Sequence, residues 1–131
     1  MSKVEKFREV LSQEKINTII TIINKILSKY SIDDIAESRN NNNAIGVSSD
    51  DVNIWIRIMP VKDEKCKLEV STIYFSEKYR RKGIFTSLYT ELLNCDIIEK
   101  IAICSVCTPE MESWCSKNEL VYDGYGNYLS K

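Results

Sequence analysis

Hydrophobic residues recur every three or four positions through the first part of the chain, which is typical of amphipathic helices. The pattern predicts helix over residues 3–30. Because serine is a common N-cap residue, a break near Ser12 with a second helix starting there is an alternative. A further short helical segment is expected over residues 31–38. Because four asparagines, residues 40–43, then mark a loop, residues 1–39 are predicted to form a helical N-terminal part.

From residue 44 onward, hydrophobic residues either alternate with polar ones or run without a break. Alternation is typical of strands with one buried face, and continuous runs are typical of strands buried on both faces. The strands expected on this basis span residues 52–59, 67–75, 100–107 and 121–129. Two amphipathic segments predict helices over residues 84–93 and 109–118.

This order of elements predicts an α/β (α+β) fold in a single domain, residues 1–131. After the N-terminal helices comes an antiparallel meander of about three strands, so residues 44–131 hold the sheet. The step from strand 67–75 through helix 84–93 to strand 100–107 is expected to be a right-handed parallel crossover. The result is a mixed, mostly antiparallel sheet with helices on both faces.

Composition and charge narrow the class of protein. The formal net charge is −1, which argues against a general nucleic-acid-binding protein, since such proteins are usually basic. The longest apolar run, residues 16–27, is interrupted by polar residues and is too short to span a bilayer, so no membrane partner is expected. Five cysteines, an odd number without a framework spacing, favour a reducing compartment, and a cytoplasmic location is expected.

No metal site is expected. The chain has no histidine, and its one closely spaced pair of cysteines is Cys104 and Cys107. This pair falls in an expected strand, where residues three apart point to opposite faces of the sheet. That arrangement is poor geometry for binding one metal ion.

One segment carries candidate binding chemistry, directly after the expected strand 67–75. Four of the five residues 78–82 are basic, Gly83 follows, and the expected helix begins at Ile84. A helix start offers unpaired backbone N–H groups and the positive end of the helix dipole, and glycine lets an anion approach the backbone closely. The segment therefore indicates an anion-binding loop, and the competing interpretation is a solvated basic loop before an ordinary helix.

The spacing of this loop resembles the cofactor loop of the GNAT superfamily of N-acetyltransferases, which reads Gln/Arg-x-x-Gly-x-Gly/Ala between a strand and a helix. The loop in this chain reads Arg80-Arg81-Lys82-Gly83-Ile84-Phe85. Arg80 and Gly83 match the family pattern, and Phe85 departs from it where the family more often has a small residue. Residues 108–120 are similar in length and hydrophobic placement to the family's next helix, and the resemblance covers about residues 52–129.

In that family two central parallel strands splay apart in a V, and the pantetheine arm of acetyl-coenzyme A lies in the gap between them. The resemblance therefore implies acetyl-coenzyme A as cosubstrate. It also implies backbone contacts from the end of strand 67–75 and a pyrophosphate at the helix start. The cofactor-binding residues that it implies are Ile73, Phe75, Arg80, Arg81, Lys82, Gly83, Ile84, Phe85 and Thr86.

Three residues are candidates for catalytic proton transfer. Glu69, which by a period of two shares a face with Ile73 and Phe75, is placed like the general base of some family members, and the competing interpretation is a cross-strand charge partner. Cys115 occupies the position where many members carry a tyrosine acid, and the alternative is a small buried apolar residue. Tyr122 offers a hydroxyl for the same acid role.

The resemblance implies an N-acyltransferase that moves an acetyl group to an amine of a small molecule or protein by direct attack. Two other functions fit the same residues. One is a coenzyme A-binding domain with little or no catalysis, and the other is a small α/β interaction domain whose basic loop has no ligand. A monomer or a homodimer is expected.

Overall fold

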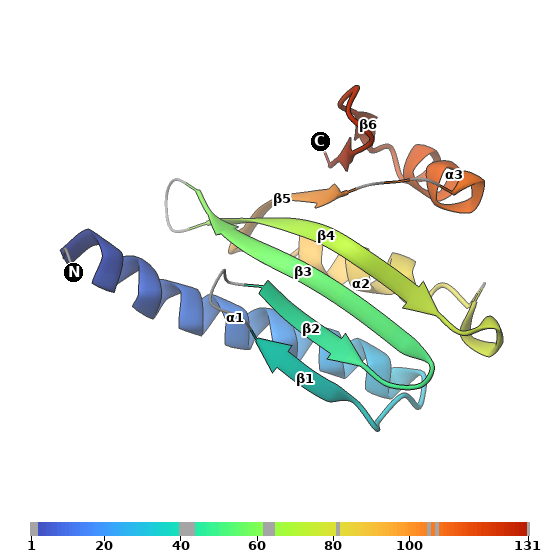
Figure 1. The fold of residues 1–131 in the computed structure, drawn as a ribbon, viewed down its shortest axis with the longest axis horizontal. Coiled ribbons are helices and arrows are strands. Elements are labelled where there is room, and N and C mark those ends of the chain that lie inside the picture. Colours follow the sequence, from blue (N-terminus) through green and yellow to red (C-terminus); the bar gives the residue numbers. More distant parts are fainter. Residues whose placement is uncertain are drawn as a thin grey trace.

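The computed structural model describes residues 3–39, 44–61, 65–80, 82–104, 106 and 108–130, with side chains from residue 13 onward (Figure 1). Its helices and strands, in chain order, are α1 (Lys3–Lys29), β1 (Ala36–Arg39), β2 (Ala44–Ser48), β3 (Val52–Pro60), β4 (Cys66–Phe75), the short 3-10 helix η2 (Glu77–Tyr79), α2 (Ile84–Leu93), β5 (Ile98–Ile103), α3 (Pro109–Lys117), β6 (Val121–Tyr122) and β7 (Tyr128–Leu129). The described strands form one sheet in the order β1-β2-β3-β4-β5-β7-β6.

The sheet is mixed, as the sequence predicted. Neighbouring strands pair antiparallel except β4 and β5, which pair parallel and are joined through α2. This order, with one parallel crossover beside an antiparallel meander, is the arrangement that the resemblance to the GNAT superfamily implies. The predicted α/β fold class with a mixed, mostly antiparallel sheet is therefore confirmed.

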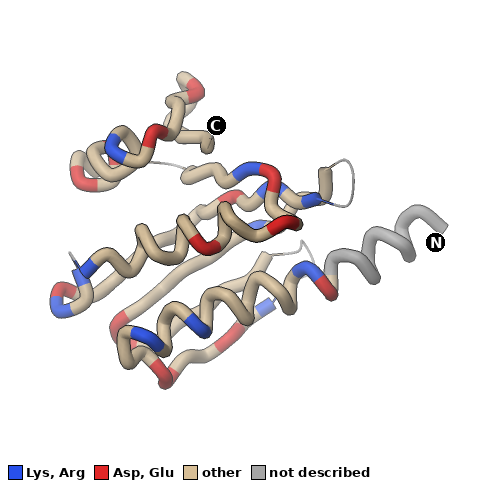
Figure 2. Tube along the Cα trace, turned by 180° about the vertical axis from the view of Figure 1, so that it is seen from behind, with Lys and Arg blue, Asp and Glu red and all other residues tan. Residues whose placement is uncertain are grey.

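Helix α1 is continuous over Lys3–Lys29 and does not break at Ser12. Its buried apolar residues lie at helical spacing and share one face: Ile16, Ile19, Ile20, Ile23, Ile26 and Leu27. This face packs against α2 and β3, and α1 and α2 lie side by side (Figure 2). None of the described helices is long and apolar enough to cross a lipid bilayer.

The prediction of a helical segment over residues 31–38 is wrong, because the chain forms the edge strand β1 there. Residues Ala36–Arg39 pair antiparallel with β2, and the guanidinium of Arg39 donates hydrogen bonds to the side chains of Gln13 and Asn17 on α1. Strand β1 is held by contacts with residues far away in the sequence, which the local pattern of residues 31–39 does not contain. The helical N-terminal part therefore ends before β1 begins.

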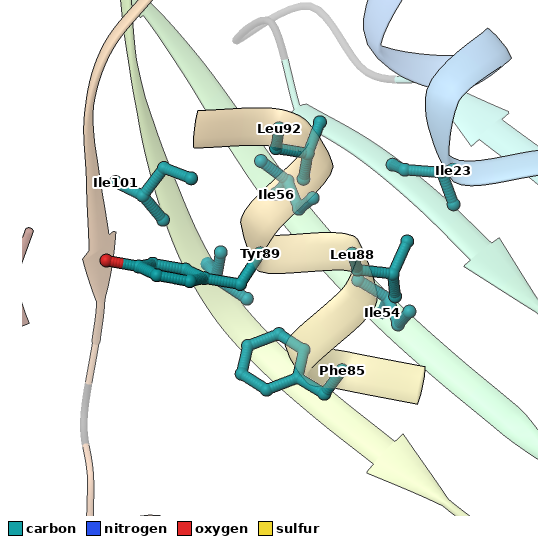
Figure 3. A pocket seen from close by; sticks show the side chains of 9 residues that line it. Ile23, Ile54, Ile56, Phe85, Leu88, Tyr89, Leu92 and Ile101 are labelled. Atoms are coloured by element: carbon teal, nitrogen blue, oxygen red, sulfur yellow. The ribbon is translucent and has the colours of Figure 1, made fainter. Parts of the chain in front are cut away.

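Helices α1 and α2 share one face of the sheet. Side chains from α1, α2, β3 and β5 meet there (Figure 3). The labelled side chains of this packed layer are Ile23, Ile54, Ile56, Phe85, Leu88, Tyr89, Leu92 and Ile101. The space left among them is about 10 Å³, roughly that of one water molecule. Helix α3 packs Trp114 against Phe85 and Tyr89 of α2. Helix α2 therefore contacts both α1 and α3.

The last predicted strand is two short strands instead of one. Gly124 and Gly126 adopt positive φ angles of 87° and 88°, and the chain turns back between β6 and β7. Strand β5 begins at Ile98 and ends at Ile103, earlier than the predicted strand 100–107, and Cys107 lies outside the described residues.

Candidate functional site

Strands β4 and β5 separate partway along their length and leave a V-shaped gap. Their pairing ends at Val70 and Ile103, where the Cys104 N–H donates a last hydrogen bond of 2.9 Å to the Val70 carbonyl. Strand β4 then continues to Phe75, and within the described residues no strand pairs with that edge of it. The gap has a volume of about 270 Å³ and is lined by Val70, Ser71, Thr72, Ile73, Ile103, Cys104, Val106, Thr108 and Met111. The splay that the resemblance implies is confirmed.

A β-bulge in β4 lies where the gap opens. Trp55 of β3 pairs with Thr72 and the next residue, Ile56, pairs with Val70, so Ser71 is the extra residue. One extra residue reverses the alternation of side chains along a strand. A bulge also bends and twists the strand that carries it, which accounts for the departure of β4 from β5 at this point.

The bulge overturns the prediction that Glu69 shares a face with Ile73 and Phe75. Ile73 lies opposite Ile54, whose side chain packs against α2, whereas Glu69 lies opposite Arg57 on the other face. Period-two counting fails because it assumes no inserted residue between positions 69 and 73. Glu69 is therefore on the face of the sheet that α1 and α2 leave uncovered.

On that face Glu69 lines a second hollow, here called the open-face pocket. Its volume is about 440 Å³, and its lining is Ala44, Trp55, Arg57, Glu69, Ser71, Thr72 and Cys104. Ser71, Thr72 and Cys104 line both the gap and the open-face pocket, so the two hollows adjoin at the bulge. A molecule in the gap and a molecule in the pocket would meet beside these three residues.

Charged side chains of both signs surround the junction, the place where the gap and the open-face pocket adjoin at Ser71, Thr72 and Cys104. The Nη1 atom of Arg57 lies 4.0 Å from Oε1 of Glu69. Burial raises the pKa of the Cys104 thiol, Glu69 and Asp123 raise it further, and Lys67 and Arg57 lower it. Two anionic and two cationic side chains therefore act on Cys104, and its thiol is protonated at neutral pH.

The N-terminus of α2 has the features of an anion site. Gly83 is the N-cap residue with a positive φ of 77°, and a Cβ placed on it would meet no described atom within 4 Å. Among the described residues no side chain caps this helix start, and its first turn has no acidic residue. The first N–H groups of α2 thus have no capping side chain and lie beside a backbone conformation that favours glycine.

The basic side chains near this helix start have local partners as well. Lys78 and Lys82 place their Nζ atoms 5.1 and 5.6 Å from the centre of the Tyr79 ring. Arg80 turns back toward β4, where its Nε donates a 2.7 Å hydrogen bond to the Phe75 carbonyl. Lysine and arginine positions, blue in Figure 2, gather around the loop before α2. Arg81 lies outside the described residues.

The loop itself is anchored to the hairpin between β2 and β3 through Asp51. The Asp51 carboxylate accepts a 2.8 Å hydrogen bond from the Ser76 hydroxyl and lies 3.5 Å from Nζ of Lys78. The Asp51 carbonyl also accepts from the Ser76 N–H at 2.7 Å. These contacts fix the path of the chain between the end of β4 and the start of α2.

The first residues of α2 contribute backbone to the candidate anion site and side chains to packing. Ile84 is buried, and the ring of Phe85 lies 4.5 Å from that of Trp114. The Thr86 hydroxyl accepts a 3.0 Å hydrogen bond from Nε1 of Trp114. The Phe85 side chain, which departs from the family's small residue, is therefore accommodated by contact with α3.

Cys115 and Tyr122 lie apart from the linings of both hollows. Cys115 is fully buried on α3, and burial raises the pKa of its thiol to about 11. Tyr122 is exposed in the β6–β7 hairpin, where its hydroxyl accepts a hydrogen bond from the Gly126 N–H. The structure thus brings Glu69 to the junction, and it brings neither candidate acid there.

Sequence reasoning did not single out Arg57 or Thr72 as site residues. A usable signal exists for Arg57, because residues 57 and 69 are equally distant from the middle of the connection between β3 and β4. A simple hairpin register places such residues opposite each other. Thr72 has no such signal, since its place in the pocket depends on the bulge.

No protein-family model and no curated protein matches the sequence. Several solved structures are similar in fold. An acetyltransferase from Thermus thermophilus is 10% identical, with a TM-score of 0.48, over 79% of this chain and 69% of that chain. Arabidopsis thaliana Naa50 in complex with the bisubstrate analogue CoA-Ac-MVNAL is 9% identical, with a TM-score of 0.42, over 67% and 70%. Arabidopsis thaliana NAA60 in complex with a bisubstrate analogue is 12% identical, with a TM-score of 0.43, over 69% and 76%.

Proposed function

We propose that the protein is an N-acyltransferase that uses acetyl-coenzyme A as acyl donor and an amine as acceptor. One observation carries the proposal: the gap between β4 and β5 and the open-face pocket meet at Ser71, Thr72 and Cys104. Two adjoining hollows suit a reaction between two substrates. The cofactor-loop pattern at Arg80 and Gly83, read from the sequence, supports the same assignment.

The residues present fit coenzyme A in three respects. The open N-terminus of α2 at Gly83 suits a pyrophosphate, because backbone N–H groups and the helix dipole both favour an anion there. Lys82 adds positive charge nearby. The unpaired edge of β4 suits the amides of a pantetheine arm, which would add to the sheet as an extended chain does. On this assignment Ile73 and Phe75 contribute backbone, and Ile84, Phe85 and Thr86 contribute the helix start.

When bound, acetyl-coenzyme A supplies a thioester whose carbonyl carbon accepts the amine nitrogen and whose sulfur departs as a thiolate. Glu69 is the group of this chain that we assign to accept the proton from the amine, because its carboxylate faces the open-face pocket near the junction. Thr72 and Trp55 hold the acceptor's position as walls of the same pocket. The acid role of Cys115 or Tyr122 remains a prediction.

The four described cysteines that are free of disulfides support a reducing location such as the cytoplasm. A small molecule or a protein amine is proposed as acceptor.

The test is a thiol-release assay with acetyl-coenzyme A and a panel of primary amines. Release of free coenzyme A that depends on both the amine and the protein, with the acetylated amine found by mass spectrometry, is the expected result. Binding of acetyl-coenzyme A without turnover of any amine would instead indicate a coenzyme A-binding domain. Absence of binding would indicate an interaction domain.

A further inference from the structure

The open-face pocket presents opposite charges on neighbouring strands. Arg57 lies on β3, and Glu69 lies opposite it on β4, the strand that borders the gap. Their closest side-chain atoms are 4.0 Å apart, longer than a hydrogen bond, so the contact is a loose ion pair. Within the described part of the chain the guanidinium of Arg57 has no other ion pair or hydrogen bond. Its donors therefore remain available to a ligand.

Beside these charges the open-face pocket has an aromatic wall, the indole of Trp55. Trp55 lies over Gly46 so closely that a Cβ on the glycine would come within 2.5 Å of the indole ring. Gly46 pairs with Trp55 in the neighbouring strand, and the absence of a side chain there is what seats the ring on the sheet. The indole ring offers an apolar surface on which a short hydrocarbon chain can pack.

We propose that the acceptor carries a carboxylate as well as its amine. The carboxylate binds the guanidinium of Arg57, and the amine lies at Glu69 beside the junction with the gap. This inference rests on the proposed function, because it takes the open-face pocket as the acceptor site. Since the Nη1 atom of Arg57 and Oε1 of Glu69 lie 4.0 Å apart, the two charged groups of the acceptor are separated by a similarly short distance. A short ω-amino acid chain has this length.

The charges around the junction favour such an acceptor over other amines. Arg57 and Lys67 are cationic, Glu69 and Asp123 are anionic, and all four act on the Cys104 thiol between them. A ligand with one positive and one negative group complements this balance. A diamine would place its second ammonium against Arg57, and a plain alkylamine would leave the guanidinium without a partner. Arginine also binds carboxylates in a two-pronged geometry that lysine does not reproduce.

The experiment compares amines that differ in the carboxylate alone. β-Alanine, 4-aminobutyrate and 5-aminovalerate are paired with propylamine, butylamine and pentylamine, and 1,4-diaminobutane is added. Transfer from acetyl-coenzyme A is measured as kcat/KM for each amine with the full chain. Binding of the same amines is measured by titration calorimetry, with and without desulfo-coenzyme A. Calorimetry does not depend on turnover, so it tests the pocket even if the proposed transfer reaction fails.

The expected result is that 4-aminobutyrate exceeds butylamine by about 10- to 100-fold in kcat/KM and in affinity, the range for a hydrogen-bonded contact with a charged group. Arg57→Gln should reduce this ratio to near one. Arg39→Gln is the matched control, since it removes the same charge from edge strand β1, outside the pocket lining, and should keep the ratio. Equal or better binding of butylamine or 1,4-diaminobutane, or no binding of any of the three carboxylates, would overturn the proposal. A failed transfer assay with the expected binding ratios would overturn the acyltransferase function and leave the pocket assignment in place.

Discussion

The two faces of strands β3 and β4 are formed by alternate residues of the same two segments and differ in packing. Toward α1 and α2, Ile54, Ile56 and Val70 meet the helices and leave a residual space of about 10 Å³. On the other face, Trp55, Arg57 and Glu69 border a hollow of about 440 Å³. Alternate residues of one strand point to opposite faces. Neighbouring residues of the chain therefore serve different roles: one packs against the helices, and the next lines the open-face pocket.

The bulge at Ser71 joins the two regions. By reversing the alternation, it keeps Ile73 on the packed face and puts Thr72 into the open-face pocket. It also coincides with the point where β4 leaves β5. We therefore expect substitutions on the packed face to change the free energy of unfolding and substitutions on the open face to change turnover.

The largest expected effect is on the packed face. Leu68 is fully buried between β3 and β5, and Leu68→Ala should lower the free energy of unfolding by about 2–5 kcal/mol through lost contacts and a cavity. Equilibrium denaturation in urea measures it. The matched variant is Glu69→Gln at the next residue, which faces the open pocket and should cost within about 1 kcal/mol. Similar costs for the two variants would contradict the division between the faces.

The next effect is on turnover. Glu69→Gln keeps the size of the side chain and removes the proton acceptor, so it should reduce kcat by about 10²-fold or more. The affinity for acetyl-coenzyme A should change little, because Glu69 is outside the lining of the gap. Stopped assays at saturating acceptor give kcat, and calorimetry gives the affinity. Parental turnover in this variant would make Glu69 a structural charge partner of Arg57.

A smaller effect is expected at the helix start. Gly83→Asp places a negative charge and a side chain where the pyrophosphate is proposed to lie, and should weaken coenzyme A binding about tenfold or more. Arg80→Ala should weaken it less, because Arg80 is already engaged with the Phe75 carbonyl, and its effect should shrink at high salt. Gly124→Asp, also at positive φ but in the β6–β7 hairpin, controls for backbone strain. If Gly83→Asp binds as the parent does, the phosphate site lies elsewhere.

The smallest effect tests Cys115. Folding raises the pKa of its buried thiol from an ordinary 9.0 to about 11, so the folded state holds the proton more tightly than the unfolded state. The stability from this difference is complete below pH 9 and is lost as the pH rises through about 11. Cys115→Ala should lower the melting temperature at pH 7 and lose less stability between pH 9 and 11 than the parent. Its kcat should remain near parental, and a large fall in kcat at unchanged stability would instead assign it the acid role.

The elements fixed by local sequence were predicted most accurately. Helix α2 spans the predicted residues 84–93, since an amphipathic pattern follows a glycine N-cap. Helix α3 begins at Pro109 as predicted, with the Thr108 hydroxyl accepting a hydrogen bond from the Met111 N–H. Both starts depend on contacts within four residues, which a single sequence contains.

Elements that depend on distant partners were not predicted. Strand β1 exists because β2 pairs with it and α1 supplies partners for Arg39. The bulge at Ser71 depends on the register between β3 and β4, and no residue type in β4 marks it. The open-face pocket has the same origin, because its lining comes from several segments of the chain. The cofactor-loop residues were identified from the motif, whereas the acceptor side of the site required the structure.

The most direct test of the account is thermal unfolding of the parent protein with acetyl-coenzyme A. A ligand that binds the folded state alone, at about 100 times its Kd, adds about 2.7 kcal/mol to the free energy of unfolding. For a chain of 131 residues this corresponds to a rise of roughly 5–10 °C in Tm. We expect such a rise with both acetyl-coenzyme A and desulfo-coenzyme A, since the proposed contacts are with the phosphates and the pantetheine arm. An unchanged Tm at millimolar concentrations of both ligands would contradict it.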